Sequence, residues 1–221
     1  VKPVGASTVF RSGWGDTKDE YRPVRTAGRE LFAGNVQAAW VCEHTLHVVK
    51  DGKVATMPWD DRPPDWGRWD GQLHDRGKIF EDPVEAAWVW RESSEASWDL
   101  YVVKGCKVAK ARFSNGTEEI EWDGKLFQWG VFSDSDSVIA AWVAREEFEE
   151  NRTILEGEFL YVVIDSKKSR RIGGGRYEVL KSEFGGDGFQ EKQPIWPPLE
   201  EGLCKTAWLY NDEIFVVVAD R

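Results

Sequence analysis

The sequence predicts an all-β fold, a four-bladed β-propeller, because two apolar motifs alternate along the chain and helix signals are almost absent. The first motif occurs as Ala38-Ala39-Trp40, Ala86-Ala87-Trp88, Ala140-Ala141-Trp142 and Thr206-Ala207-Trp208. The second, an aliphatic run, begins at residues 46, 100, 160 and 214, at steps of 54, 60 and 54. Repeats of this length are supersecondary units that bury their apolar faces only against one another.

The first three repeats are expected to supply four strands each. In repeat 1 these cover residues 37–42, 46–50, 53–59 and 66–73, with a hairpin turn at Asp51-Gly52. In repeat 2 they cover 85–90, 99–104, 107–113 and 118–122. Repeat 3 opens with its Ala-Ala-Trp strand and continues at 159–164, about 168–172 and 176–182. Its long first loop, Arg145 to Gly157, carries an acidic run that we expect to be solvated.

The fourth repeat supplies only two strands, at 205–210 and 213–219. Two strand candidates near the N-terminus, Thr8-Val9-Phe10 and Tyr21-Arg22-Pro23-Val24, belong to no other repeat. If they complete the last blade, the ring closes and no long sheet edge is left exposed. We therefore predict one domain over 1–221, with blades at about 36–83, 84–137, 138–203, and 204–221 together with 1–35.

Composition limits the classes of partner. The formal charge is −10 and the pI about 4.9, so the basic footprint of a nucleic-acid-binding protein is missing. No apolar run approaches the roughly 20 residues of a membrane helix, so no membrane span is expected. Cations, neutral sugars and small apolar molecules remain as ligands, and the sequence does not determine the oligomeric state.

The cysteines and the glycosylation signals bear on whether the protein is secreted or cytoplasmic. Cys42 and Cys204 lie in repeats that a closed ring makes neighbours, so they either form a disulfide or stay free and buried; Cys106 is left over. Asn115-Gly116-Thr117 and Asn151-Arg152-Thr153 are acceptors for N-glycosylation in a secreted protein. The sequence therefore favours secretion, with a cytoplasmic location as the alternative.

Polar residues follow each repeat tryptophan by three and four positions. They are Glu43-His44, Arg91-Glu92, Arg145-Glu146 and Asn211-Asp212. Equivalent loops of a propeller gather on one face around the channel, so these side chains are expected to form a charged mouth that holds a polar ligand. The alternative is that Arg91–Glu92 and Arg145–Glu146 pair with each other as solvated loop ends.

Aromatic residues also recur at equivalent positions. Tyr101 and Tyr161, with His47 and Phe215, occupy one place in the second strand, and Trp40, Trp88, Trp142 and Trp208 one place in the first. They either wall a cavity for a sugar ring or hydrophobic ligand, or pack between blades. The sequence contains thirteen tryptophans, so we expect some of them to form solvent-exposed aromatic surfaces and others to lie in the core.

Signals for catalysis and for metals are weak. There is no Gly-x-Ser-x-Gly nucleophile elbow, although Glu43, Glu92, Glu146 or His44 could act as a general base in a partly dry funnel. His44, His47 and His74 lack zinc-ligand spacing, so no metal site or cofactor is expected.

The motifs resemble those of the hemopexin-like propellers. Trp196-Pro197-Pro198-Leu199 before Thr206-Ala207-Trp208, and Leu100-Tyr101-Val102-Val103-Lys104-Gly105, are similar to that family's linker and second strand. The resemblance implies a four-bladed ring whose channel carbonyls can hold a cation. The repeats also resemble fungal fucose-binding lectins, whose blades end near a tryptophan, as Trp59, Trp66, Trp69, Trp122 and Trp129 would here. That likeness implies sugar binding.

Three functions follow as hypotheses. The first is a binding protein that takes a small molecule or carbohydrate at the mouth. The second is an enzyme of secondary metabolism, a cyclase or isomerase, that uses the same funnel. The third is a protein-interaction module. Near-equivalent sites in several blades would favour a lectin, and unequal first loops favour one asymmetric pocket.

Overall fold

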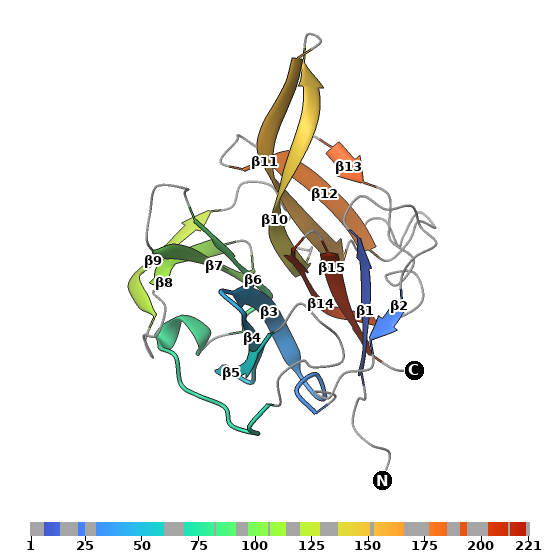
Figure 1. Ribbon diagram of the computed structural model, residues 1–221. Coiled ribbons are helices and arrows are strands. Elements are labelled where there is room, and N and C mark those ends of the chain that lie inside the picture. The colour runs from blue at the N-terminus through green and yellow to red at the C-terminus, as the bar shows by residue number, and fades with distance from the viewer. Residues whose placement is uncertain are drawn as a thin grey trace.

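The computed structural model describes residues 7–13, 22–24, 30–59, 69–81, 83–91, 97–105, 107–113, 120–128, 137–150, 153–165, 177–184, 191–193, 203–211 and 213–219. These residues form four antiparallel sheets, which we call blades 1 to 4 (Figure 1). The described residues include no α-helix, and their single 3-10 helix is η1 (Lys78–Phe80). Nor do they include a helix with the length and apolar character needed to cross a membrane.

Blades 1 to 3 each consist of consecutive strands, and blade 4 joins strands from both ends of the chain. Blade 1 contains β3 (Val36–Cys42), β4 (Thr45–Lys50) and β5 (Lys53–Pro58). Blade 2 contains β6 (Ala86–Trp90), β7 (Trp98–Lys104), β8 (Lys107–Phe113) and β9 (Glu121–Gln128). Blade 3 contains β10 (Ser137–Glu150), β11 (Thr153–Asp165), β12 (Tyr177–Glu183) and β13 (Glu191–Gln193). Blade 4 contains β14 (Leu203–Tyr210), β15 (Glu213–Ala219), β1 (Ser7–Gly13) and β2 (Arg22–Val24).

The ring closes through the N-terminal strands. β1 pairs with β15 along its whole length, from Ser7 opposite Ala219 to Gly13 opposite Glu213, and β2 continues the sheet (Figure 1). The innermost strands contact each other in sequence around the ring, β3 with β6, β6 with β10, β10 with β14 and β14 with β3. The predicted four-bladed propeller, with its last blade completed by N-terminal strands, is confirmed.

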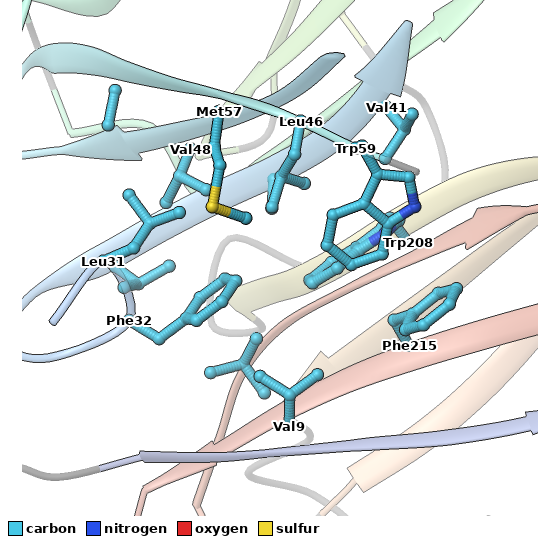
Figure 2. Packing of buried hydrophobic residues seen from close by; sticks show 14 residues of the cluster. Val9, Leu31, Phe32, Val41, Leu46, Val48, Met57, Trp59, Trp208 and Phe215 are labelled. Atoms are coloured by element: carbon cyan, nitrogen blue, oxygen red, sulfur yellow. The ribbon is translucent and has the colours of Figure 1, made fainter. Parts of the chain in front are cut away.

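The core lies between the blades. Side chains of an inner strand alternate between two neighbours, so Ala39 and Val41 of β3 pack toward blade 4 while Trp40 and Cys42 pack toward blade 2. Figure 2 shows the interface of blades 4 and 1, where the edge of Trp59 meets Trp208 at 5.7 Å between ring centroids. The paired alanines are at most 2% exposed, and their small side chains allow four strands to approach one axis.

The residue before each Ala-Ala or Thr-Ala pair lies at the start of the first strand, at the end of the propeller away from the turn between the first and second strands. In three blades the ladder shifts register there, at Gln37, Ile139 and Lys205. The Lys205 amine donates to the Gly34 carbonyl at 2.9 Å and to Ser7 Oγ at 2.8 Å. In blade 2 the Glu85 carboxylate accepts the amide of Val138, from the next blade, at 3.1 Å. These contacts tie neighbouring blades together.

The first connection of blade 3 differs from the prediction. Residues 145–150 and 153–158 are not a solvated loop but continue β10 and β11 as paired strands, with Arg145 opposite Glu158 and Glu150 opposite Thr153. This ribbon stands away from the ring at the top of Figure 1. The β-branched residues Thr153 and Ile154 favour an extended backbone, and the acidic residues do not prevent it because both faces of the ribbon reach water.

Three outer strands also differ from the prediction. In repeat 1, residues 69–73 form no strand, and the sheet is extended only by a bridge between Val54 and His74; residues 60–68 lie outside the described part. In repeat 2, β9 runs to Gln128, past a register shift opposite Ala109 and Ala111. In repeat 3, β12 pairs directly with β11 and is the third strand, while 168–172 lies outside the described residues.

The cysteines do not form the proposed bridge. Cys42 packs between blades 1 and 2 and Cys204 between blades 3 and 4, and both are free. Burial raises the pKa of each thiol to about 12, which keeps it protonated and unreactive. Cys106, Asn115 and Asn151 lie outside the described residues.

Candidate functional site

We define the mouth as the end of the propeller at which the first and second strands of the blades are connected. In blade 1 the connection is a two-residue turn, with φ of 41° at Glu43 and 60° at His44. Positive φ at both central positions is the hairpin geometry whose twist matches that of the flanking strands. The turn leaves both side chains exposed, and its carbonyl at His44 accepts the Trp59 amide at 2.7 Å.

Blade 1 is joined at the mouth to both of its neighbours. His44 Nδ1 is hydrogen-bonded to the Tyr210 hydroxyl of blade 4 at 3.0 Å. On the other side, the Trp98 indole N–H of blade 2 donates to Glu43 Oε1 at 3.4 Å. Two predicted site residues thus lie together, each held by an aromatic residue of an adjacent blade.

Arg91 belongs to the same group. Its guanidinium lies over the Trp98 ring, 4.8 Å from the ring centroid, a geometry that favours a cation–π contact. Arg91 is exposed and Trp98 half-buried, so the pair borders solvent. The mouth group therefore consists of Glu43, His44, Arg91, Trp98 and Tyr210; Glu92 and Asp212 lie outside the described residues.

Arg145 and Glu146 point to opposite faces of the ribbon, because neighbouring residues of a strand alternate. On one face Arg145 pairs with Glu158 at 3.1 Å, and the Trp90 indole of blade 2 donates to the other oxygen of Glu158 at 2.7 Å. The predicted pairing of Arg145 with Glu146 is therefore wrong. Instead, Arg145 takes part in a contact between blades 2 and 3.

On the other face Glu146 forms a largely buried cluster. It accepts hydrogen bonds from the Tyr161 hydroxyl and from the Lys181 amine, the latter at 2.6 Å. The Lys181 amine also lies 4.1 Å from the centroid of the Phe159 ring. Glu146 and Tyr161 thus contact each other and Lys181 rather than the mouth group.

The repeat tryptophans form one stacked cross-strand pair in each blade. The pairs are Trp40–His47, Trp88–Tyr101, Trp142–Tyr161 and Trp208–Phe215, with centroids 5.1, 5.1, 5.8 and 5.4 Å apart. The indoles are only 2–4% exposed. They occupy the interblade packing position that we considered as the alternative, and a role for them in walling a ligand cavity stays a prediction.

A cation accompanies the second-strand aromatic residue in three blades. Lys110, Lys181 and Arg11 are the third-strand neighbours of Tyr101, Tyr161 and Phe215. Each cation pairs with a carboxylate, Asp99 at 2.7 Å, Glu146 at 2.6 Å and Glu213 at 3.4 Å respectively. We call these three sets the aromatic–cation–carboxylate trios; they lie in the half of each blade nearest the mouth.

Blade 1 departs from this pattern. Its second-strand residue is His47, opposite Thr56. Burial, with a smaller contribution from the charge of Arg76, lowers the pKa of His47 to about 3. The imidazole is therefore neutral at physiological pH and acts as a flat ring stacked on Trp40.

No group of three His, Cys, Asp or Glu side chains that could hold a metal ion occurs in the described parts of the chain. The inner edges of β3, β6, β10 and β14 face the axis, because each of these strands pairs only on its outer side. A channel cation held by their carbonyls stays a prediction.

Comparison with known proteins identifies the architecture. No protein-family model and no curated protein matches the sequence. Among solved structures, the hemopexin-fold protein CP4 from cow pea matches with a TM-score of 0.53 at 14% identity, over 81% of this chain and 79% of that one. The fold is that of the hemopexin-like propellers. A 2S albumin seed protein from Dolichos also matches, with a TM-score of 0.53 at 12% identity over 80% of this chain and 79% of its own.

In this hemopexin-like propeller, sequence reasoning missed the residues that come from neighbouring blades. Trp98 and Tyr210 complete the mouth group, Trp90 and Glu158 join blades 2 and 3, and Lys181 completes the blade 3 cluster. The excess of tryptophan outside the repeat motif was the one signal that could have drawn attention to Trp90 and Trp98.

Proposed function

We propose that this protein binds a carbohydrate, or a small molecule with a similar polar ring, at the mouth group. The observation that carries the proposal is the half-buried Trp98, whose indole is flanked by the Arg91 guanidinium and the Glu43 carboxylate, with His44 beside it. These side chains come from two adjacent blades, and Tyr210 adds a third.

The chemistry of this group matches that of a sugar ring. A pyranose has a face of C–H groups and a rim of hydroxyls, so it suits an aromatic surface bordered by charged hydrogen-bonding groups. Glu43 can accept hydroxyl protons, Arg91 can donate to ring or hydroxyl oxygens, and His44 and Tyr210 can do either. The net charge of −10 opposes anionic ligands and favours neutral or amino sugars.

The trios support a lectin-like function because they recur. In blades 2, 3 and 4 the aromatic residue and the cation occupy equivalent positions. The carboxylate comes from the second strand in blades 2 and 4 and from the first strand in blade 3. Repetition of this kind is expected of a protein that presents related binding surfaces around a ring.

The test is a glycan array followed by calorimetric titration of the best hit. Arg91→Ala and Glu43→Gln should each weaken binding about tenfold or more, since each removes a charged protein group that would hydrogen-bond to the ligand. Lys125→Ala is the matched control, because Lys125 is an exposed cation on the outer strand β9. Absence of binding to any glycan at high protein concentration, or equal loss in the control, would refute the proposal.

An enzymatic function has one observation in its favour. The exposed His44 is hydrogen-bonded to the Tyr210 hydroxyl, and an imidazole next to a phenol can serve general acid–base catalysis of an isomerisation or cyclisation. Prolonged incubation of a bound ligand with the protein, followed by NMR of the ligand, tests it. Conversion that His44→Gln abolishes while binding persists would establish the enzyme, and an unchanged ligand would exclude it for that compound.

A secreted location accompanies the binding proposal, because free glycans and glycoconjugates are most abundant outside the cytosol. The acceptor tripeptides at Asn115 and Asn151 provide the test. Intact-mass analysis of protein from its native source should show glycans at one or both positions. Unmodified asparagines together with a cytosolic fraction would contradict it.

A further inference from the structure

The ribbon of residues 145–158 is a surface that the mouth does not use. β12 pairs with β11 only from Phe159 onward, and the last hydrogen bond on that side runs from the Phe184 amide to the Glu158 carbonyl at 2.8 Å. Beyond it, among the described residues, β11 pairs with β10 alone. Over residues 153–157 its outer edge therefore has no strand partner in the described part of the chain, and its backbone donors and acceptors can pair with an added strand.

Two aliphatic side chains of this edge are exposed. Ile154 is 71% exposed, the largest exposure among the described large hydrophobic residues, and Leu155 is 38% exposed. As neighbours on a strand they lie on opposite faces of the ribbon, so each face carries one. On either face, a strand added at this edge can therefore place a side chain beside an exposed aliphatic residue.

The charges of the ribbon select the class of partner. Residues 145–158 contain six acidic and two basic residues. Glu147 and Glu156 stand directly opposite each other in the ladder and are both exposed, an arrangement of like charges that destabilises a sheet. A second copy of this chain would add the same negative charge, whereas a cationic segment would relieve the repulsion.

We propose that the ribbon binds an extended, basic segment of a partner protein, which adds as a strand to the edge of β11. The added strand would continue the line that β12 leaves at Glu183. Its Lys or Arg residues would lie on the face that carries Glu147, Glu156 and Ile154, and its apolar residues on the face that carries Leu155. This interaction is independent of ligand binding at the mouth.

The probe is a fluorescent ten-residue peptide in which Lys and Val alternate, titrated into the full chain and followed by anisotropy. Two peptides serve as controls, one with Glu in place of Lys and one with N-methyl groups on the residues that would face β11. The first tests charge and the second tests backbone pairing. We expect the unmodified peptide to bind at least tenfold more tightly than either control, and more weakly as salt is raised.

Variants locate the site. Ile154→Lys and the double variant Glu147→Gln/Glu156→Gln should each weaken binding at least tenfold. Phe127→Lys is the matched control, because Phe127 is 53% exposed on the separate edge strand β9 and its replacement should change affinity less than twofold. Hydrogen exchange at the amides of 153–157 should slow when the peptide is bound.

Four outcomes would overturn the proposal. They are no binding at millimolar peptide, equal binding of the N-methylated peptide, equal loss in the Phe127→Lys control, and a dimer in light scattering that Ile154→Lys dissociates. The last would make a second copy of this chain the occupant.

Discussion

Blades 1 and 3 have the same core and different surroundings. In both, an inner-strand tryptophan stacks on the opposite residue of the second strand, Trp40 on His47 and Trp142 on Tyr161. Four residues after the tryptophan, however, blade 1 has the exposed turn residue His44, and blade 3 has Glu146 in a largely buried cluster. Position in the repeat therefore determines packing between blades but not the chemistry at the mouth.

The difference shows how the repeat has been adapted. A two-residue turn in blade 1 keeps Glu43 and His44 at the mouth, next to residues of blades 2 and 4. In blade 3 the same connection is drawn out into a ribbon that stands away from the ring (Figure 1). Glu147 and Ile154 belong to the paired strands of this ribbon. In our proposals, blade 1 thus contributes to the ligand site and blade 3 to the interaction surface.

The shared core gives the largest expected effect. Trp40→Ala and Trp142→Ala should each lower the free energy of unfolding by about 3–5 kcal/mol, since each leaves a cavity between blades. Urea denaturation measures both, with Ile154→Ala as an exposed control of little effect. A loss in only one of the two blades would break the equivalence of their cores.

Substitution of the fourth residue after the tryptophan should lower stability by different amounts in the two blades. Glu146→Ala leaves the buried Tyr161 hydroxyl and Lys181 amine without their carboxylate, so we expect a loss of about 2–4 kcal/mol. His44→Ala removes only an exposed contact and should cost less than about 1 kcal/mol. Similar losses in the two variants would mean that the mouth turn is as structural as the blade 3 cluster.

The second-strand residue of blade 1, His47, should make the free energy of unfolding depend on pH. Because the folded pKa of His47 is near 3 and its ordinary value is 6.5, the unfolded chain binds a proton first as pH falls. The stability is fully present above about pH 6.5 and declines as pH falls toward 3, by roughly 1–2 kcal/mol between pH 7 and pH 5.

His47→Phe, which copies Phe215 of blade 4, should remove this decline. Tyr161→Phe in blade 3 is the comparison variant, since it carries no group that titrates in this range. Thermal melts from pH 4.5 to 7.5 measure the effect. A slope that is the same in the wild type and in His47→Phe would assign the pH dependence to other groups.

The smallest effect concerns the mouth turn. Glu43 has a φ of 41°, which asparagine adopts more readily than glutamate. Glu43→Asn should therefore leave stability unchanged to within about 0.5 kcal/mol, while glycan binding weakens about tenfold. Thermal melts and calorimetric titration of the same variant separate the two roles. A large loss of stability would show that Glu43 serves the fold.

The sequence predicted the ring because its core is periodic. Trp40, Trp142 and their counterparts recur in register with the second-strand residues, so the inner hairpins and the pairing of β1 with β15 followed from counting strands. The ribbon was missed because an acidic run such as Glu146-Glu147 is also typical of solvated loops. Of the residues that the structure brings together, Glu43, His44 and Arg91 were predicted from their positions in the repeat. Trp98 and Lys181 were not, since contacts between blades and buried charge pairs have no signature in one sequence.

The most direct test of the mouth as the ligand site uses the tryptophans. In a proton–nitrogen NMR titration with the best glycan, the indole N–H signals of Trp98 and Trp90 should shift, because these half-buried rings border the mouth. The signals of Trp59 and Trp208, which lie in the core of Figure 2, should stay in place. Shifts confined to Trp69 or Trp122, near the outer strands, would contradict the proposed site.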